Sequence, residues 1–296
     1  MCRILKSVVL GLFVLSSFLV QAQVDLGYTL EVGQNFRIKQ NANQLMIQTL
    51  EGSSHEITNE LEGLFTFEVT SKTDTGYDLA LKFEDFALKS SSSIQGTLID
   101  VRASEPVDGD MMSAIFNGLI GYELTVKMGA LGQITTVEGG EGLIQNMIAN
   151  AGIEDEFTAN LMKKSLEGEF GTESLAKSFE QMTFFYPKEK IAVGETWTNK
   201  HEGKLSSENI WKLEKIENGM ASITGDADIT VNNEDENLKM NLTGKQETAL
   251  EASIENGFIK KMMVSSMAEG NSTMPQMGSA EIPTKLESTI TYELID

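Results

Sequence analysis

The structural pattern of this chain changes within residues 184–197, which read FFYPKEKIAVGETW. Residues before this stretch follow a helical period, whereas residues after it alternate as strands do. Pro187 cannot continue a helix and favours extended geometry in the residue before it. Gly194 supplies a turn, and we expect Trp197 in the core of the strands that follow. Pro187, Gly194 and Trp197 are therefore predicted to be structural residues at a joint between helices and sheet.

Alternating apolar and polar residues on both sides of this joint predict antiparallel strands. In the second half, Ile210–Leu213 and Met220–Ile223 flank an Asn218-Gly219 turn, a strong hairpin signal. In the first half, Phe65–Val69 and Tyr77–Phe83 alternate around a turn that ends at Gly76.

The two strand-rich halves resemble each other in order. Residues 30–36 (LEVGQNF) parallel residues 191–197 (IAVGETW), and Phe67–Leu81 parallels Trp211–Ile223. Leu124–Ile134 likewise parallels Leu250–Ile259. The spacing between these segments is not constant, so they represent either a degenerate duplication or two meanders with generic turns.

Helical periodicity marks two parts of the chain. Residues 141–186 carry apolar residues on one face of each of two or three short amphipathic helices. A further apolar helix follows Asp110, a predicted N-cap, with Met111, Met112, Ile115, Phe116 and Leu119 at helical spacing. This helix either packs on the sheet as part of the core or uses those five residues to line an apolar cavity.

These patterns predict an α+β fold. We expect a curved antiparallel sheet, an open or half-closed barrel, with short helices between two similar halves and packed on one face. The expected segments are a signal peptide at 1–22, a strand-rich half at 23–140, helices at 141–186 and a second strand-rich half at 187–296, together forming one composite domain.

The N-terminus has the features of a secretory signal peptide. Arg3 and Lys6 precede an apolar run, Val8–Val20, which is shorter than the roughly 20 residues a membrane-spanning helix needs. Small residues then predict cleavage after Ala22. Cys2, the only cysteine, lies before the apolar run, where no lipid would be attached. We expect an exported protein, periplasmic or extracellular, that is neither lipid-anchored nor integral to the membrane, and whose mature chain contains no disulfide.

Charge excludes one class of partner. Asp and Glu number 44 against 23 Lys and Arg, a formal net charge of −21. Such a chain repels phosphate backbones, so we expect no nucleic-acid partner.

No catalytic motif is evident. The two histidines, His55 and His201, lie in polar stretches without a nucleophile motif, and we expect both on the solvated surface. The acidic clusters Asp108–Asp110 and Glu234–Asn237 lack the full spacing of a calcium loop and are better explained as ordinary polar turns. The sequence therefore predicts no metal site and no cofactor.

The order of several short motifs resembles a known family. Residues 132–139 (GQITTVEG) precede the helices, Phe185-Tyr186-Pro187 ends them, and Val193–Trp197 restarts the strands. This order is similar to an uncharacterised family of secreted proteins and lipoproteins of Bacteroidota-type bacteria, known as a domain of unknown function. The resemblance implies an envelope location and a β-rich domain, and it supplies no catalytic residues. The chain departs from the lipoprotein members because no cysteine follows its apolar run.

Three functions remain open at this level. The chain contains 15 methionines, side chains that adapt to irregular apolar partners and also fill ordinary cores. Export, these methionines and the apolar helix after Asp110 favour non-enzymatic binding of an apolar or lipid-like ligand. The alternative is a structural or protein-interaction module without a small ligand. A carboxylate-based hydrolase is a third reading, because acidic residues are abundant although none forms an evident pair.

Overall fold

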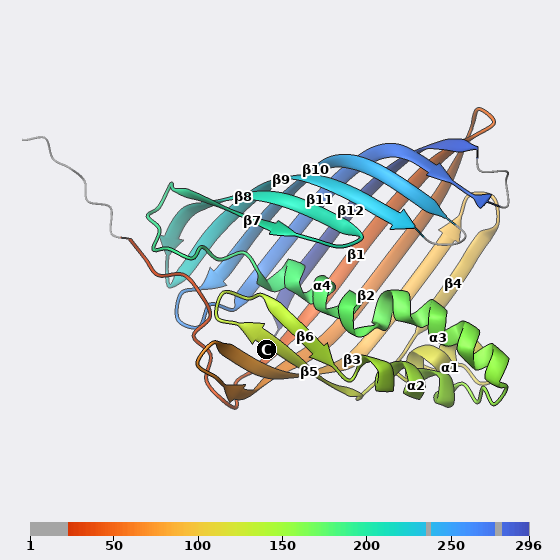
Figure 1. Cartoon of the computed structure of the whole chain (residues 1–296), viewed down its shortest axis with the longest axis horizontal. Helices are drawn as coiled ribbons and strands as arrows, with labels where there is room; N and C mark the ends of the chain where they lie inside the picture. Colours follow the sequence, from red (N-terminus) through yellow and green to blue (C-terminus); the bar gives the residue numbers. More distant parts are fainter. Residues whose placement is uncertain (1–22, 235–237, 276–279, 296) are drawn as a thin grey trace, which may run out of the picture.

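The computed structural model describes residues 23–234, 238–275 and 280–295, so the predicted signal peptide lies outside the described residues. Within them, twelve strands form one antiparallel sheet (Figure 1). The strands are β1 (Asn35–Leu50), β2 (Ser53–Lys72), β3 (Gly76–Ser92), β4 (Gly96–Arg102), β5 (Glu123–Gly129), β6 (Ile134–Glu138), β7 (Thr196–His201), β8 (Leu205–Glu217), β9 (Met220–Glu234), β10 (Lys239–Ser253), β11 (Ile259–Thr273) and β12 (Glu281–Ile295). Their order is β6-β5-β3-β2-β1-β12-β11-β10-β9-β8-β7, and β4 pairs with β3. The two halves therefore share one sheet, joined where β1 pairs with β12.

Four helices pack on one face of this sheet, which confirms the predicted α+β class. They are α1 (Met111–Asn117), α2 (Gly140–Asn150), α3 (Glu156–Phe170) and α4 (Thr172–Thr183). Asp110 caps α1 as predicted, because its carboxylate accepts the backbone N–H of Met112 at 2.9 Å. The ring of Phe179 on α4 packs edge-on against Phe65 and Phe67 on β2. We call the face of the sheet that carries these two rings the inner face, and the opposite one the outer face.

Helix α4 lies between the two ends of the sheet. On the β6 side, the Thr183 hydroxyl donates to the carbonyl of Gly132 at 2.7 Å, and Glu180 accepts the backbone N–H of Ile134 at 3.3 Å. On the β7 side, the Asn199 amide donates to the carbonyl of Phe184 at 2.6 Å. The first and last strands of an open sheet thus flank the same helix, and the inner face becomes a concave surface beneath α3 and α4 (Figure 1).

The two halves repeat one meander, β1-β2-β3-β5-β6 and β7-β8-β9-β10-β11. Each begins at a glycine with φ of +90°, Gly33 or Gly194. The N–H of Gly33 donates to the carbonyl of Val69 on the next strand at 2.8 Å, and that of Gly194 donates to Leu213 at 2.7 Å. The strand register shifts directly after Val69 and directly after Leu213. The predicted likeness between the halves is therefore confirmed at the level of hydrogen bonds and bulges.

The side chains that follow these glycines extend the likeness. Gln34 accepts the backbone N–H of Glu31 at 2.9 Å, and Glu195 accepts that of Ala192 at 2.8 Å. Both residues close the same tight four-residue turn, so the parallel between LEVGQNF and IAVGETW is structural as well as sequential.

The joint at Phe184–Trp197 contributes buried residues to the core at Phe185–Pro187 and Ile191–Ala192. Tyr186 is buried and its hydroxyl donates to the carbonyl of Gly257 at 2.7 Å, while Pro187 is buried just beyond the end of α4. Trp197 differs from the expectation, because it is half-buried at the margin of the core and its indole N–H donates to the carbonyl of Phe185 at 2.8 Å. The fully buried tryptophan is Trp211, which is 1% exposed.

Candidate functional site

A cavity of about 590 Å³ lies between the inner face and helices α3 and α4. Strands β1, β2, β3 and β12 form one wall, and the helices supply Phe170, Leu175, Ser178 and Phe179. The apolar residues of the sheet wall are Ala42, Leu61, Phe65, Phe83, Phe86, Leu88 and Ile290. Its neutral polar residues are Gln40, Gln44, Asn59, Ser288 and Tyr292.

A smaller hollow of about 120 Å³ continues toward β7–β11. It shares Gln44, Ser288, Ile290 and Tyr292 with the larger cavity, so the two spaces adjoin along the inner face. Its other lining residues are mainly apolar, with Gln246, Thr248 and Ser266 from β10 and β11 as neutral polar groups.

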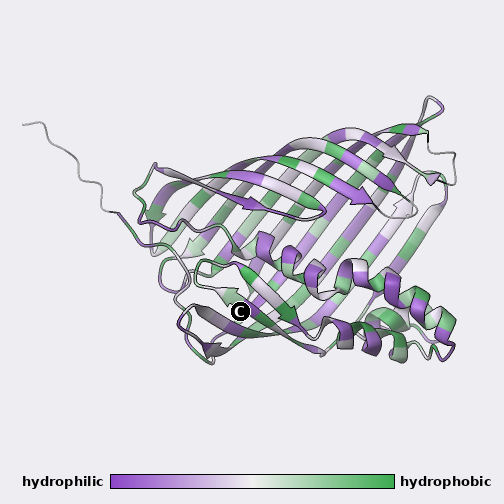
Figure 2. Cartoon of the chain, in the orientation of Figure 1, coloured by the Kyte–Doolittle hydropathy of each residue, from purple (hydrophilic) through white to green (hydrophobic). Residues whose placement is uncertain are grey.

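The strands contribute no Asp, Glu, Lys or Arg to the lining of either space among the described residues, in a chain of which 23% is charged. The charged lining residue is Glu169 on α3, and Lys204 pairs with it at 2.8 Å. Successive side chains of a strand point to opposite faces, so charge can be confined to the outer face. Figure 2 shows the resulting alternation of hydrophilic and hydrophobic residues along the strands.

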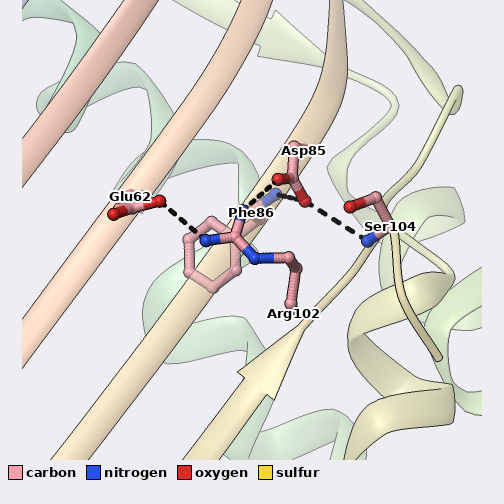
Figure 3. A network of polar contacts seen from close by, with 5 residues as sticks. All are labelled: Glu62, Asp85, Phe86, Arg102 and Ser104. Carbon is pink, nitrogen blue, oxygen red and sulfur yellow. Dashed lines mark hydrogen bonds and ion pairs between the residues drawn. The ribbon is translucent and has the colours of Figure 1, made fainter. Parts of the chain in front are cut away.

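Charged residues of the strands lie on the outer face. Arg102 on β4 forms ion pairs with Glu62 on β2, at 2.7 Å, and with Asp85 on β3 (Figure 3). Burial raises the pKa of Asp85, but hydrogen bonds from Ser104, Arg102 and the backbone of Phe86 outweigh it and hold that pKa below its usual range. Arg102 is thus paired with both carboxylates, and these ion pairs link β2, β3 and β4.

Neutral polar residues form a row across the inner face. The strand registers place Ser90, Asn59, Gln44, Ser288, Ser266 and Gln246 opposite one another on six neighbouring strands. The hydroxyl of Ser90 donates to Asn59 at 2.7 Å, and the amide of Asn59 donates to Gln44 at 3.1 Å. We call these six residues the polar row. It crosses a surface that is otherwise largely apolar.

The expectation of two solvated histidines is wrong for His201 and needs correction for His55. His201 is 6% exposed and lines the smaller hollow. Its Nε2 lies 3.0 Å from the carbonyl of Phe184, which can only accept, and its Nδ1 lies 3.4 Å from the hydroxyl of Ser207. His55 is half-buried, with Nε2 at 2.9 Å from the hydroxyl of Ser92. Strand alternation places both rings on the inner face, which their polar neighbours in the sequence had concealed.

Burial lowers the pKa of His201, and the hydrogen bond to Phe184 opposes that shift only in part. The folded protein therefore holds His201 neutral while the unfolded chain binds a proton near pH 6.5. The contribution of His201 to the free energy of unfolding is fully present above that pH, and it is lost as the pH falls from about 6.5 toward the folded pKa of His201.

We expect the melting temperature of the natural protein to drop between pH 7 and pH 5, and to drop less in His201→Gln. Glu180, whose pKa burial raises, contributes with the opposite sign in both proteins and cancels in the comparison. Equal pH dependence in the two proteins would contradict this account.

The five residues predicted to line a cavity occupy three environments. Phe116 borders the larger cavity, where its ring stacks on Phe86. Ile115 and Leu119 are fully buried in the core. Met111 and Met112 are 51% and 37% exposed on the outer side of α1. The structure thus brings only Phe116 to the cavity.

Most of the lining could not be assigned from single motifs. One signal was present in β1, where the inward positions Gln40, Ala42 and Gln44 are uncharged although Lys39 lies beside them. Uncharged polar residues at alternate positions of several long strands would have identified this face.

Among the described residues, no group of three or more His, Cys, Asp or Glu could hold a metal ion. Residues 235–237 of the acidic cluster Glu234–Asn237 lie outside them. No helix in the described ranges is long and apolar enough to cross a membrane.

Two solved structures resemble the fold at low identity. Lipovitellin, in a structure of its lipid-protein interactions, shares 11% identity and a TM-score of 0.49 over 90% of this chain, which spans about a quarter (26%) of lipovitellin. An outer membrane channel from Pseudomonas putida F1 shares 9% identity and a TM-score of 0.28, covering 92% of this chain and 100% of the channel. Both likenesses are too distant to bear on function.

Comparison with sequences gives a family and no further relative. No curated protein matches the chain. A family model matches residues 74–259, more than half of the sequence, and covers β3 to β10 with all four helices. The expectation of an uncharacterised family is confirmed: the chain belongs to the family of unknown function DUF6263.

Proposed function

We propose that this protein is an exported, non-enzymatic envelope protein that holds an apolar, lipid-like ligand in the cavity between its sheet and α3–α4. The observation that carries the proposal is a cavity of about 590 Å³ to which the strands contribute no charged residue. Pockets for small ligands are typically 300–1,000 Å³, mostly apolar, with a few neutral polar groups. The features of residues 1–22 support export.

Ring contacts and a hydrogen bond hold α3 and α4 above the sheet. Phe170 and Phe116 pack edge to face with their ring centroids 6.3 Å apart, and Phe179 packs against Phe65 and Phe67 of β2. Lys204, in the β7–β8 connection, donates to the carbonyl of Gly168 at 3.0 Å and so fixes the C-terminal end of α3. These contacts hold the helices above the concave sheet while leaving space beneath them.

Filling the cavity should weaken ligand binding. Ala42 lies in the lining of the larger space, so a phenyl ring at that position would occupy volume meant for the ligand. We expect Ala42→Phe to bind a hydrophobic fluorescent dye roughly tenfold or more weakly, and to lose no more than about 1–3 kcal/mol of stability, the usual cost of added volume, because the ring enters existing space. The measurement is a dye titration with lipid displacement, together with a urea unfolding curve.

The matched control is Asn43→Phe, which adds the same ring to the next residue of β1, exposed on the outer face. Dye binding by this variant should equal that of the natural protein. If Ala42→Phe bound the dye as tightly as Asn43→Phe does, the cavity would not be the binding site. The structural or protein-interaction module would then be the better account.

A further inference from the structure

The cavity contains hydroxyl groups that the protein itself does not use. Ser266 and Ser288 lie directly opposite each other on β11 and β12, and both line the hollow. Neither side chain forms a hydrogen bond within the described residues, although both are half-buried. A pair of half-buried hydroxyls without protein partners can each donate one hydrogen bond and accept others.

Two further neutral groups face the same space. Gln246 on β10 lies opposite Ser266 in the polar row, and its amide has no hydrogen-bond partner in the described structure. Tyr292 is 7% exposed and borders both spaces. The side-chain amide of Gln40 donates to the Tyr292 hydroxyl over a long distance, 3.5 Å. The Tyr292 hydroxyl itself donates to no acceptor among the described residues. Burial raises the pKa of Tyr292 to about 12, so the hydroxyl remains a donor at neutral pH.

These four groups set the chemistry of the ligand's polar part. Hydroxyl and amide groups pair with the carbonyl and hydroxyl groups of a neutral ligand. A buried carboxylate or phosphate would need a cationic partner, and neither Lys nor Arg lines the cavity. The charged lining residue, Glu169, is itself an anion that Lys204 already pairs with, so it offers a bound anion no partner. A pure hydrocarbon would leave the hydroxyls without partners, which is also unfavourable.

We propose that the ligand is an uncharged single-chain lipid ester, of the monoacylglycerol class, whose ester and hydroxyl groups bond to Ser266, Ser288, Gln246 and Tyr292. Its acyl chain lies beneath α3 and α4, among Phe65, Phe83, Phe86 and Phe179. This inference rests on the proposed function and specifies the class of lipid that the same cavity selects.

Three probes of equal chain length test the proposal: monoolein, oleate at pH 8 and 1-octadecene. Binding to the full-length protein is measured by displacement of a hydrophobic dye. We expect monoolein to bind at least tenfold more tightly than oleate, because an ionised carboxylate is not accommodated in an uncharged cavity. We expect 1-octadecene to bind more weakly than monoolein and to be insensitive to changes in the polar row.

The discriminating variant is Ser266→Ala with Ser288→Ala. Loss of two hydrogen bonds should weaken monoolein binding about tenfold and leave 1-octadecene binding unchanged. The control is Ser265→Ala with Thr289→Ala, the neighbouring residues of the same two strands, which pair with each other on the outer face. This control should bind all three probes as the natural protein does. Tyr292→Phe, which keeps the ring, should weaken monoolein binding by about fivefold.

Two outcomes would overturn the inference while sparing the proposed function: oleate binding as tightly as monoolein, or the inner double variant retaining full affinity for monoolein. Failure of all three probes, 1-octadecene included, to displace the dye would instead contradict the proposed function itself.

Discussion

Replacing Trp211 with Ala is expected to lower the free energy of unfolding by about 3–5 kcal/mol, as removal of a fully buried aromatic side chain does. Trp211 is 1% exposed, and its indole N–H donates to the side chain of Asn199 at 2.8 Å. Its ring lies over Gly225 on β9, where a Cβ would come within 2.5 Å of the ring. The substitution removes this packing and leaves Asn199 without one of its donors.

The control is Trp197→Ala in the paired strand, since Trp197 and Trp211 are partners in the register of β7 and β8. Trp197 is half-buried, so its loss should cost less than that of Trp211. Urea unfolding monitored by circular dichroism measures both variants. A larger loss for Trp197→Ala would show that the core of the second half is centred on the other tryptophan.

Gly132→Ala is expected to destabilise the protein by about 2–5 kcal/mol, because backbone strain and a steric clash act together. Gly132 has φ of +97°, and a Cβ there would lie 1.9 Å from the carbonyl oxygen of Thr183 and 2.8 Å from the ring of Tyr28. The hydroxyl of Tyr28 donates to that same carbonyl at 2.9 Å. The added methyl group must therefore push the C-terminal end of α4 away from the turn before β6.

Gly121→Ala separates strain from clash, since Gly121 has φ of +72° and no atom within 4 Å of an added Cβ. This control should cost only about 1–2 kcal/mol, the strain of a left-handed backbone. The same unfolding measurement applies to both. Equal losses would mean that the contact between the Gly132 turn and Thr183 does not hold α4 in place.

The sequence predicts the elements well where the signal is local. Alternation and turn chemistry identify the hairpins at Gly76 and Asn218-Gly219, and Asp110 identifies the start of α1. The repeated Val-Gly turn is visible because a left-handed position needs glycine and is followed by the same hydrogen bonds at Gly33 and Gly194.

The position and most of the lining of the cavity could not be predicted, because they depend on non-local geometry. The cavity exists only because β6 and β7, the two ends of the sheet, approach the same helix, and no local pattern specifies that approach. Met111 and Met112 are apolar and at helical spacing, yet both are exposed on α1, whereas Ile115 and, just beyond the helix, Leu119 are buried. Which of two paired tryptophans is buried likewise depends on a neighbouring strand, since the Trp211 ring packs over Gly225 of β9.

Native mass spectrometry of the full-length protein, after exposure to a bacterial membrane extract, tests the central claim most directly. We expect the natural protein and Asn43→Phe to retain a non-covalent lipid that is released on collisional activation, and Ala42→Phe to be free of it. Natural protein without any bound lipid, or equal lipid occupancy in Ala42→Phe and Asn43→Phe, would contradict the claim that the space between the sheet and α3–α4 is a binding site.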